Sequence, residues 1–76
     1  MVIYMQGKGC TEIENAVVEM ERYTCKISHP MFQGADIRVF SRFGDELDKK
    51  FWLRHRGGEI VFSRLPEGSM IVMAEG

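Results

Sequence analysis

Residues 50–65 have the sequence KFWLRHRGGEIVFSRL, and this stretch decides the fold that we expect. Two runs of alternating apolar and polar residues flank Gly57-Gly58, and a two-residue glycine loop supplies the positive φ angles of a type I′ hairpin turn. The turn sets the register of the two strands, with Arg56 opposite Glu59. One face of the hairpin then buries four apolar side chains, those of Phe51, Leu53, Ile60 and Phe62.

A second turn follows at Leu65-Pro66-Glu67-Gly68. Pro66 presets φ at the second position of a type I turn, and Gly68 supplies the left-handed conformation of a bulge. The pattern therefore predicts that residues 69–74 fold back as a strand beside residues 59–65. Both faces of this last strand are apolar, which places it at the centre of a sheet or beneath the helix or a partner.

The N-terminal third predicts one helix. Residues 2–6 form a short apolar strand that ends in the turn Gly7-Lys8-Gly9. Thr11 and Glu14 then fit a capping box, and a helix over about residues 12–22 follows from an apolar stripe with spacings of three and four residues. The stripe consists of Ile13, Ala16, Val17 and Met20. The pattern leaves open whether residues 16–22 remain helical or form a strand.

The middle of the chain alternates apolar and polar residues with a period of two, which predicts strands. Residues 23–28 form one such run, which ends at His29-Pro30, and residues 35–43 form another, followed by a polar loop over residues 44–48. The apolar side of the second run consists of Ala35, Ile37, Val39 and Phe43. We therefore expect one domain over residues 1–76 of the α+β class, with an N-terminal helix packed on an antiparallel sheet of about five strands and consecutive C-terminal hairpins.

The segment GEIVFSRLPEGS, residues 58–69, resembles the closing hairpin of the prealbumin-like β-sandwich repeats found in bacterial surface proteins. The resemblance implies shared turn chemistry in these twelve residues. The predicted helix and the lack of an export signal depart from that family, so no function is carried over from it.

Composition indicates a folded cytoplasmic protein. The hydrophobic share of 45% with 28% charged residues excludes a disordered chain, and no apolar run is long enough to span a bilayer. Because the start of the chain has no signal-peptide pattern, we expect Cys10 and Cys25 to stay reduced and expect no membrane partner. A chain of 76 residues has a thin core, which favours self-association as a homo-oligomer.

The net charge of −1 hides an uneven distribution. Every charged residue from 12 to 21 is acidic, whereas residues 38–64 hold seven basic and four acidic residues. Binding to nucleic acid would depend on a local patch, because the total charge gives no bulk attraction. The acidic helix face is either a solvated surface or a docking surface for a basic partner.

The strongest candidate site is a strand face that mixes arginine with aromatic side chains. By alternation, its members lie opposite the buried faces of two predicted strands and are Arg38, Phe40, Arg42, Trp52, Arg54 and Arg56, with Lys50 on the same side. If the strands are neighbours, this Arg/aromatic face suits a protein interface or a single strand of nucleic acid whose bases stack on the rings. In the alternative interpretation, Trp52 and Phe40 pack beneath the helix and the arginines extend past it.

Two further patterns favour plain structural roles. Residues 7–11, Gly-Lys-Gly-Cys-Thr, could hold a phosphate at a helix start, but they lack the ending of a P-loop and the third glycine of a dinucleotide fingerprint. Cys10, Cys25, His29 and His55 are residue types for a zinc or thiol site, yet only Cys25 and His29 approach ligand spacing. We expect a tight turn, buried cysteines and a turn histidine, with no metal, cofactor or catalytic residue.

These observations predict a non-catalytic binding protein. We expect a small regulator or inhibitor, of the kind that phages and mobile elements encode, that occupies a macromolecular protein partner through the Arg/aromatic face or the acidic helix. The alternative is a nucleic-acid-binding module that uses the Arg/aromatic face. An enzyme is least expected, because no complete set of nucleophile, base and stabilising donor can be assembled from the sequence.

Overall fold

The hairpin around Gly57-Gly58 forms in the predicted register. In the computed structural model, which describes residues 1–10 and 13–74, β7 (Leu53–Arg56) pairs antiparallel with β8 (Glu59–Ser63). Of the two glycines in this turn, only Gly57 has a positive φ, of 56°. This is the pattern of a type II′ turn, whereas the sequence predicted a type I′ turn. Gly58 is needed for a different reason, because a Cβ there would lie 2.9 Å from the backbone oxygen of His29.

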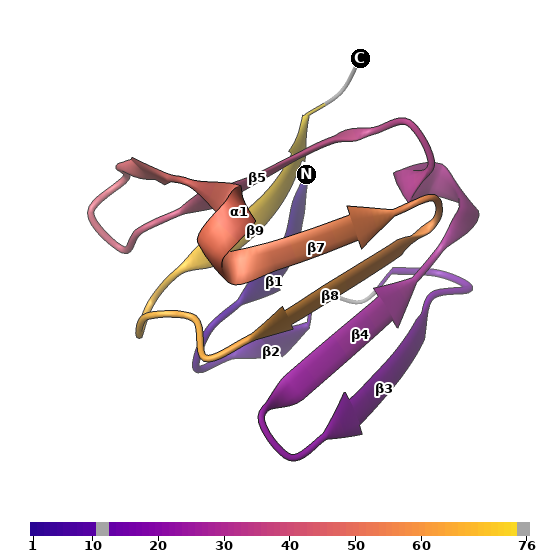
Figure 1. Ribbon diagram of the computed structural model, residues 1–76, viewed down its shortest axis with the longest axis horizontal. Helices are drawn as coiled ribbons and strands as arrows, with labels where there is room; N and C mark the ends of the chain where they lie inside the picture. Colours follow the sequence, from indigo (N-terminus) through magenta and orange to yellow (C-terminus); the bar gives the residue numbers. More distant parts are fainter. Residues whose placement is uncertain (11–12, 75–76) are drawn as a thin grey trace.

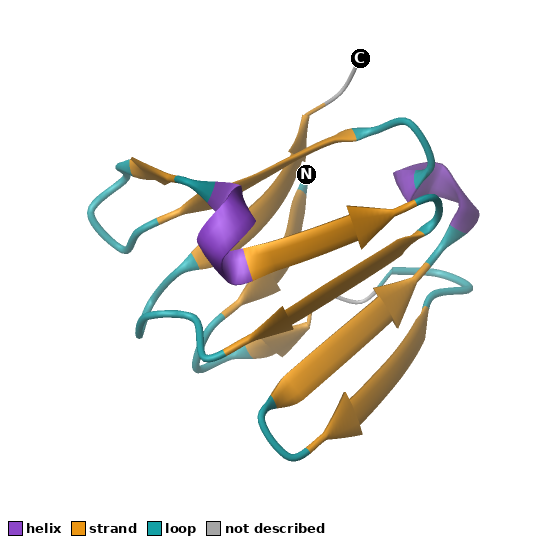
Figure 2. Ribbon diagram, viewed as in Figure 1, coloured by secondary structure: helices purple, strands orange, loops and turns teal. Residues whose placement is uncertain are grey.

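Nine strands in this described part of the chain form two antiparallel sheets that pack face to face (Figures 1 and 2). The four-stranded sheet has the order β3-β4-β8-β7, and the five-stranded sheet has the order β2-β1-β9-β5-β6. The remaining strands are β1 (Val2–Met5), β2 (Gly9–Cys10), β3 (Val17–Glu21), β4 (Thr24–Ser28), β5 (Asp36–Phe40), β6 (Glu46–Leu47) and β9 (Met70–Ala74). Two short helical turns, η1 (Pro30–Phe32) and α1 (Lys49–Trp52), lie between strands. The fold is therefore a β-sandwich.

The predicted α+β class is wrong, because residues 17–21 of the expected N-terminal helix form the edge strand β3, and residues 13–16 are not helical. Asn15 has a φ of 66°, which interrupts a helix, and Arg22 has a φ of 54° in the two-residue turn between β3 and β4. The apolar stripe divides, since Ile13 and Ala16 pack against the core while its other members are exposed. Pairing with β4 thus overrides the local helix pattern. Thr11 of the predicted capping box lies outside the described residues.

The core lies between the two sheets, where the inward side chains meet. Its buried residues are Ile3, Tyr4, Cys25, Ile27, Phe32, Ile37, Val39, Leu53, Ile60, Phe62, Leu65 and Ile71. Tyr4 and Phe62 join the sheets directly, with ring centroids 4.5 Å apart in a tilted arrangement. Ile3 and Tyr4 are both buried although they are adjacent, because the register of β1 with β9 shifts at a bulge between Val2 and Tyr4.

A turn does follow β8, but it is shifted by one residue from the prediction, since it spans residues 66–69 with Pro66 in its first position, and it does not make a hairpin. The Ser69 N–H donates to the Pro66 carbonyl at 3.1 Å, and Gly68 has a φ of 80°. This turn carries the chain from the four-stranded sheet to the five-stranded sheet, where β9 lies between β1 and β5. The predicted pairing of the last strand with residues 59–65 is therefore wrong. Its central position, which its two apolar faces indicated, is confirmed.

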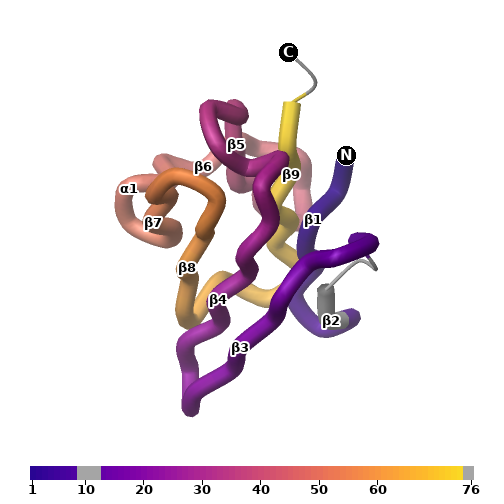
Figure 3. The backbone as a smooth tube through the Cα atoms, turned by 90° about the vertical axis from the view of Figure 1, so that its right-hand side faces the viewer, coloured from indigo at the N-terminus to yellow at the C-terminus, as the bar shows by residue number. Residues whose placement is uncertain are grey.

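The first and last strands of the chain lie side by side in the five-stranded sheet (Figure 3). The first strand, β1, pairs with the last strand, β9, over most of its length. The terminal amine of Met1 donates to the Met73 carbonyl at 2.8 Å, and the Met73 N–H donates to the Met1 carbonyl at 2.8 Å. The sandwich is thus closed by contacts between residues far apart in the sequence.

Gly68 offers a test of the turn that changes sheets. A Cβ at Gly68 would lie 2.6 Å from the Cβ of Arg42, whereas a Cβ at Gly44, which has a φ of 90°, would meet nothing within 4 Å. We expect Gly68→Ala to lower the free energy of unfolding by about 2 to 4 kcal/mol and Gly44→Ala by about 1 to 2 kcal/mol. Denaturant titration followed by fluorescence measures both losses. Equal losses in the two variants would contradict the close contact between Arg42 and this turn.

Candidate binding surface

The predicted Arg/aromatic face does not form one surface, because β5 and β7 belong to different sheets. In β5 the alternate residues are buried, so Arg38 and Phe40 lie on the outer face of the five-stranded sheet. In β7 the same alternation places Arg54 and Arg56 on the outer face of the four-stranded sheet. The outer faces of a sandwich point away from each other, so the predicted residues divide into two groups.

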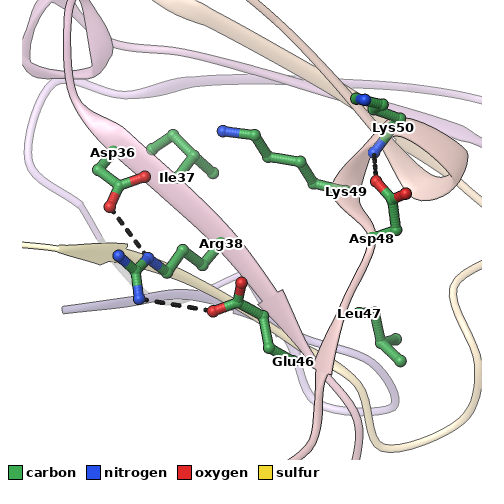
Figure 4. Close-up of a pocket in the computed structure, with 8 residues that line it drawn as sticks. All are labelled: Asp36, Ile37, Arg38, Glu46, Leu47, Asp48, Lys49 and Lys50. Carbon is green, nitrogen blue, oxygen red and sulfur yellow. Dashed lines mark hydrogen bonds and ion pairs between the residues drawn. The ribbon is translucent and has the colours of Figure 1, made fainter.

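Arg38 is held by acidic neighbours on the five-stranded sheet (Figure 4). Its Nε donates to Asp36 Oδ2 at 2.9 Å, and its Nη1 donates to Glu46 Oε1 at 3.5 Å. Beside it, a hollow of about 530 Å³ extends between β5, β6 and α1, and Lys49 reaches across it toward β5. The lining combines three acidic with three basic side chains. This balanced hollow has no strong preference for an anion or a cation.

Arg42 lies apart from both groups, in the loop that follows β5. Its guanidinium lies 4.7 Å from the ring centroid of Phe43. Phe43 was predicted on the buried side of the strand, but it is 76% exposed. The strand ends at Phe40, and a tight loop, in which the Ser41 N–H donates to the Asp45 carbonyl at 2.8 Å, turns Phe43 outward.

The β7 half of the predicted site does form a surface, which we call the cationic hollow. It is a depression of about 290 Å³ on the outer face of the four-stranded sheet, and its lining includes Lys50, Phe51, Trp52 and Arg54. Residues of β4 and β8 complete the lining, among them Thr24, Val61 and Ser63. The structure therefore brings Trp52 and Arg54 together, as the sequence predicted, and Arg56 lies farther along the same strand.

The helical turn α1 explains why Phe51 belongs to this hollow. Asp48 caps the turn, since its Oδ1 accepts the Lys50 N–H at 3.1 Å. A strand over residues 50–56 would have buried Phe51, but the helical turn breaks the alternation and leaves this ring 80% exposed. Trp52, at the end of the turn, is partly buried and packs against the core. An aspartate ahead of Lys49-Lys50 was the signal for this cap, and the strand prediction missed it.

Among the described residues, the cations of this surface form no ion pair with a carboxylate. Within residues 1–10 and 13–74, none of the ion pairs involves Arg56 or a cation of the hollow. Glu59, which lies opposite Arg56, instead pairs with Lys26 at 3.2 Å, and Glu19 pairs with Lys26 at 3.6 Å. The hydrogen bond and charge of Glu59, with the charge of Glu19, raise the pKa of Lys26. The positive charge near β7 is therefore available to a partner.

A third hollow lies beside the edge strand β3, in a region for which the sequence predicted a helix. It has a volume of about 230 Å³ and includes Met20 and Tyr23 of the β3–β4 hairpin. Both side chains are exposed, and the Arg64 guanidinium lies 5.2 Å from the ring centroid of Tyr23. The four-stranded sheet thus has exposed apolar groups at the β3 edge and cations at the β7 edge.

His29 and His55 have structural roles. His29 Nδ1 accepts the Met31 N–H at 3.0 Å, and its Nε2 donates to the Glu14 carbonyl at 2.9 Å, so that it caps η1. His55 Nε2 donates to the Phe32 carbonyl at 2.7 Å. Among the residues that the structure describes, no three His, Cys, Asp or Glu side chains converge as ligands for a metal ion.

Within the glycine loop, residues 6–8 form the turn of the β1–β2 hairpin, and Gly9 begins β2. The Lys8 N–H donates to the Met5 carbonyl at 3.1 Å, which confirms the tight turn. Residues 13–21 form no helix after it, so the phosphate arrangement that needs a helix start is absent there. The Cys10 side chain and Thr11 lie outside what the structure describes, and Cys25 is buried as predicted.

Comparisons with protein-family models, with curated proteins and with solved structures gave no match. The described part of the chain contains no helix that is long and apolar enough to cross a membrane. The cationic hollow combines an exposed aromatic ring with cationic side chains, and it is therefore the strongest candidate binding site.

The cap of α1 can be tested through Trp52, which is the one tryptophan of the chain. We expect Asp48→Ala to lower the free energy of unfolding by about 1 kcal/mol and to loosen the turn that holds Trp52. Trp52 emission should then shift to longer wavelength and be quenched more by acrylamide. Asp48→Asn keeps a capping oxygen and should give wild-type emission. An unchanged spectrum in Asp48→Ala would show that the hollow does not depend on this cap.

Proposed function

We propose that this protein is a non-catalytic binding protein that occupies an acidic surface of a protein partner through the cationic hollow. The observation that carries this proposal is the exposed ring of Phe51 beside cations. Phe51 is 80% exposed, although rings of this size are usually buried. Lys50 and Arg54 line the same hollow, and they form none of the ion pairs within the described residues. Aromatic and arginine side chains supply most of the binding energy at protein interfaces.

The hollow is also held in place before a partner binds. Arg54 lies on a strand that is paired along its length with β8, and the α1 turn that carries Phe51 is capped by Asp48. Such preorganisation lowers the entropy cost of binding. As a small regulator or inhibitor, the protein would act by covering its partner's surface, with the positive charge steering encounter. The cytoplasmic location expected from the sequence stays a prediction.

A nucleic-acid-binding module is the second candidate, and the same ring with its neighbouring cations favours it. Phosphates could contact Lys50 and Arg54 while a base stacks on Phe51. However, Trp52 is partly buried against the core, and Arg38 is engaged with two carboxylates on the opposite face. One face therefore carries fewer aromatic rings and arginines than the β-sheets that bind single-stranded nucleic acid use. For this reason the protein partner is the leading proposal.

Phe51→Ala tests the proposal, with Phe43→Ala as a matched control. Phe43 is 76% exposed and also lies beside an arginine, but it follows β5 of the other sheet. In affinity capture from a lysate of the source cell, with and without nuclease, we expect the wild-type protein and Phe43→Ala to retain the partner and Phe51→Ala to lose it. With the partner purified, Phe51→Ala should raise the Kd about 30-fold, equivalent to about 2 kcal/mol.

Equal retention by Phe51→Ala, or equal loss in both variants, would contradict a role for the cationic hollow. Capture that nuclease abolishes would favour the nucleic-acid candidate. In that case a labelled single-stranded oligonucleotide should bind at low salt, and the affinity should fall steeply toward moderate salt.

A further inference from the structure

The edge strand β3 is unusually open. All five of its residues are exposed, and in the described part of the chain it pairs with β4 alone. Figure 1 shows β3 as the outermost strand of its sheet, with β7 at the opposite edge. Val18 and Met20 share the inner face of the sheet with buried residues of β4, yet they are 45% and 72% exposed. An edge of this kind can accept another strand.

The hairpin geometry shows which backbone groups β3 offers. A two-residue turn joins β3 to β4, with Glu21 opposite Thr24. Residues that flank such a turn exchange backbone hydrogen bonds, and bonded and non-bonded pairs alternate along the ladder. Glu19 and Glu21 therefore direct their backbone groups toward β4, whereas Met20 directs its N–H and carbonyl outward. The two glutamate side chains lie on the outer face of the sheet, where Glu19 meets Lys26.

β7 is the complementary edge of the same sheet. The two-residue turn after Arg56 implies that Arg54 and Arg56 bond to β8, while Leu53 and His55 direct their backbone groups outward. The N–H of Leu53 already donates to the Lys49 carbonyl at the end of α1. His55 is therefore the position in β7 that offers both an N–H and a carbonyl to a further strand.

The directions of the two edge strands match. Strands alternate in direction across an antiparallel sheet, so β3 and β7, at the ends of a four-stranded sheet, run in opposite directions. The β7 strand of a second copy can therefore lie beside β3 as the next antiparallel strand. When Met20 lies opposite His55 of the copy, the outward backbone groups meet. The same register places Glu19 opposite Arg56 and Glu21 opposite Arg54 on one face.

We propose that β3 binds the β7 edge of a second copy of this chain, in the register that opposes Glu19 to Arg56 and Glu21 to Arg54. Pairing of β3 with another β3 is disfavoured, because the register that pairs all five residues places Glu19 opposite Glu19. Like charges in directly opposite positions destabilise a strand pair. The acidic side chains of β3 thus disfavour pairing with another β3 and favour pairing with β7.

This association goes beyond the proposed partner binding and has a head-to-tail arrangement. The assembly keeps a free β3 edge at one end and a free β7 edge at the other end, so it is open-ended. One pair of backbone-bonded residues and two exposed ion pairs give weak binding, with a Kd on the order of 0.1 to 1 mM that salt raises. Arg54 also belongs to the cationic hollow, so a docked copy competes with the partner for this residue.

Complementary charge reversal tests the register. Neither Glu21 nor Arg54 forms an ion pair within the described residues, so Glu21→Arg and Arg54→Glu should both fold. In sedimentation equilibrium at low salt, we expect the wild-type mass to rise with concentration and each variant alone to stay near the monomer mass. An equimolar mixture of the two variants should recover the wild-type rise, because every interface in the mixed chain again opposes unlike charges.

Met20→Pro tests the backbone contact independently of charge. The Met20 N–H points outward, so proline removes it without removing a hydrogen bond between β3 and β4. We expect Met20→Pro to remain monomeric and Met20→Ala to associate like the wild-type protein. Similar Tm values for the two variants would show that both are folded. If Met20→Pro does not fold, the mixture of charge variants decides the question.

A wild-type mass that stays at the monomer value, or a mixture of charge variants that does not associate, would overturn this proposal. A mass that stops at the dimer would also overturn it, because an open head-to-tail interface does not close at two copies. Phe51→Ala should associate like the wild-type protein, and Met20→Pro should capture the proposed partner normally. Failure of self-association and failure of the proposed function can therefore be told apart.

Discussion

The pairing of β9 with both β1 and β5 is the constraint on which the rest of the structure depends. β8 already has β4 and β7 on its two sides, so the final strand cannot pair with it and must enter the other sheet. There β9 joins the first strand of the chain to its middle, with the backbone groups of Met1 and Met73 hydrogen-bonded to each other. Closing so long a loop costs entropy, which burial between the two sheets must offset.

The same constraint determines which sheet edges are open for binding. Because β9 completes the five-stranded sheet, β3 and β7 remain as the open edges of the four-stranded sheet. The glutamates of β3 and the arginines of β7 give these edges opposite charge, and Lys26 between them is neutralised by Glu19 and Glu59. The cationic hollow lies at the β7 edge. Partner binding and strand addition therefore draw on one sheet, whereas Arg38 on the other sheet is held in ion pairs.

Local turn chemistry could be predicted from the sequence, but the choice of strand partners could not. Gly57-Gly58 fixes a register because few conformations close a two-residue loop, whereas residues 66–68 predict a turn without showing which sheet follows it. The predicted helix combines the capping pattern of Thr11 and Glu14 with β-branched valines, and pairing with β4 makes residues 17–21 a strand. For the site, alternation placed Arg54 and Arg38 correctly on outer faces. It could not show that those faces belong to opposite sides of a sandwich.

The position of β9 is most directly measured by nuclear Overhauser contacts between backbone protons across the strands. The two-sheet arrangement predicts contacts from Met73 to Ile37 of β5 and from Met70 to Met5 of β1. It also predicts that the backbone protons of β8 contact those of β4 and β7. Cross-strand contacts between β9 and residues 59–63 would contradict this arrangement, because they would place the last two strands in one hairpin.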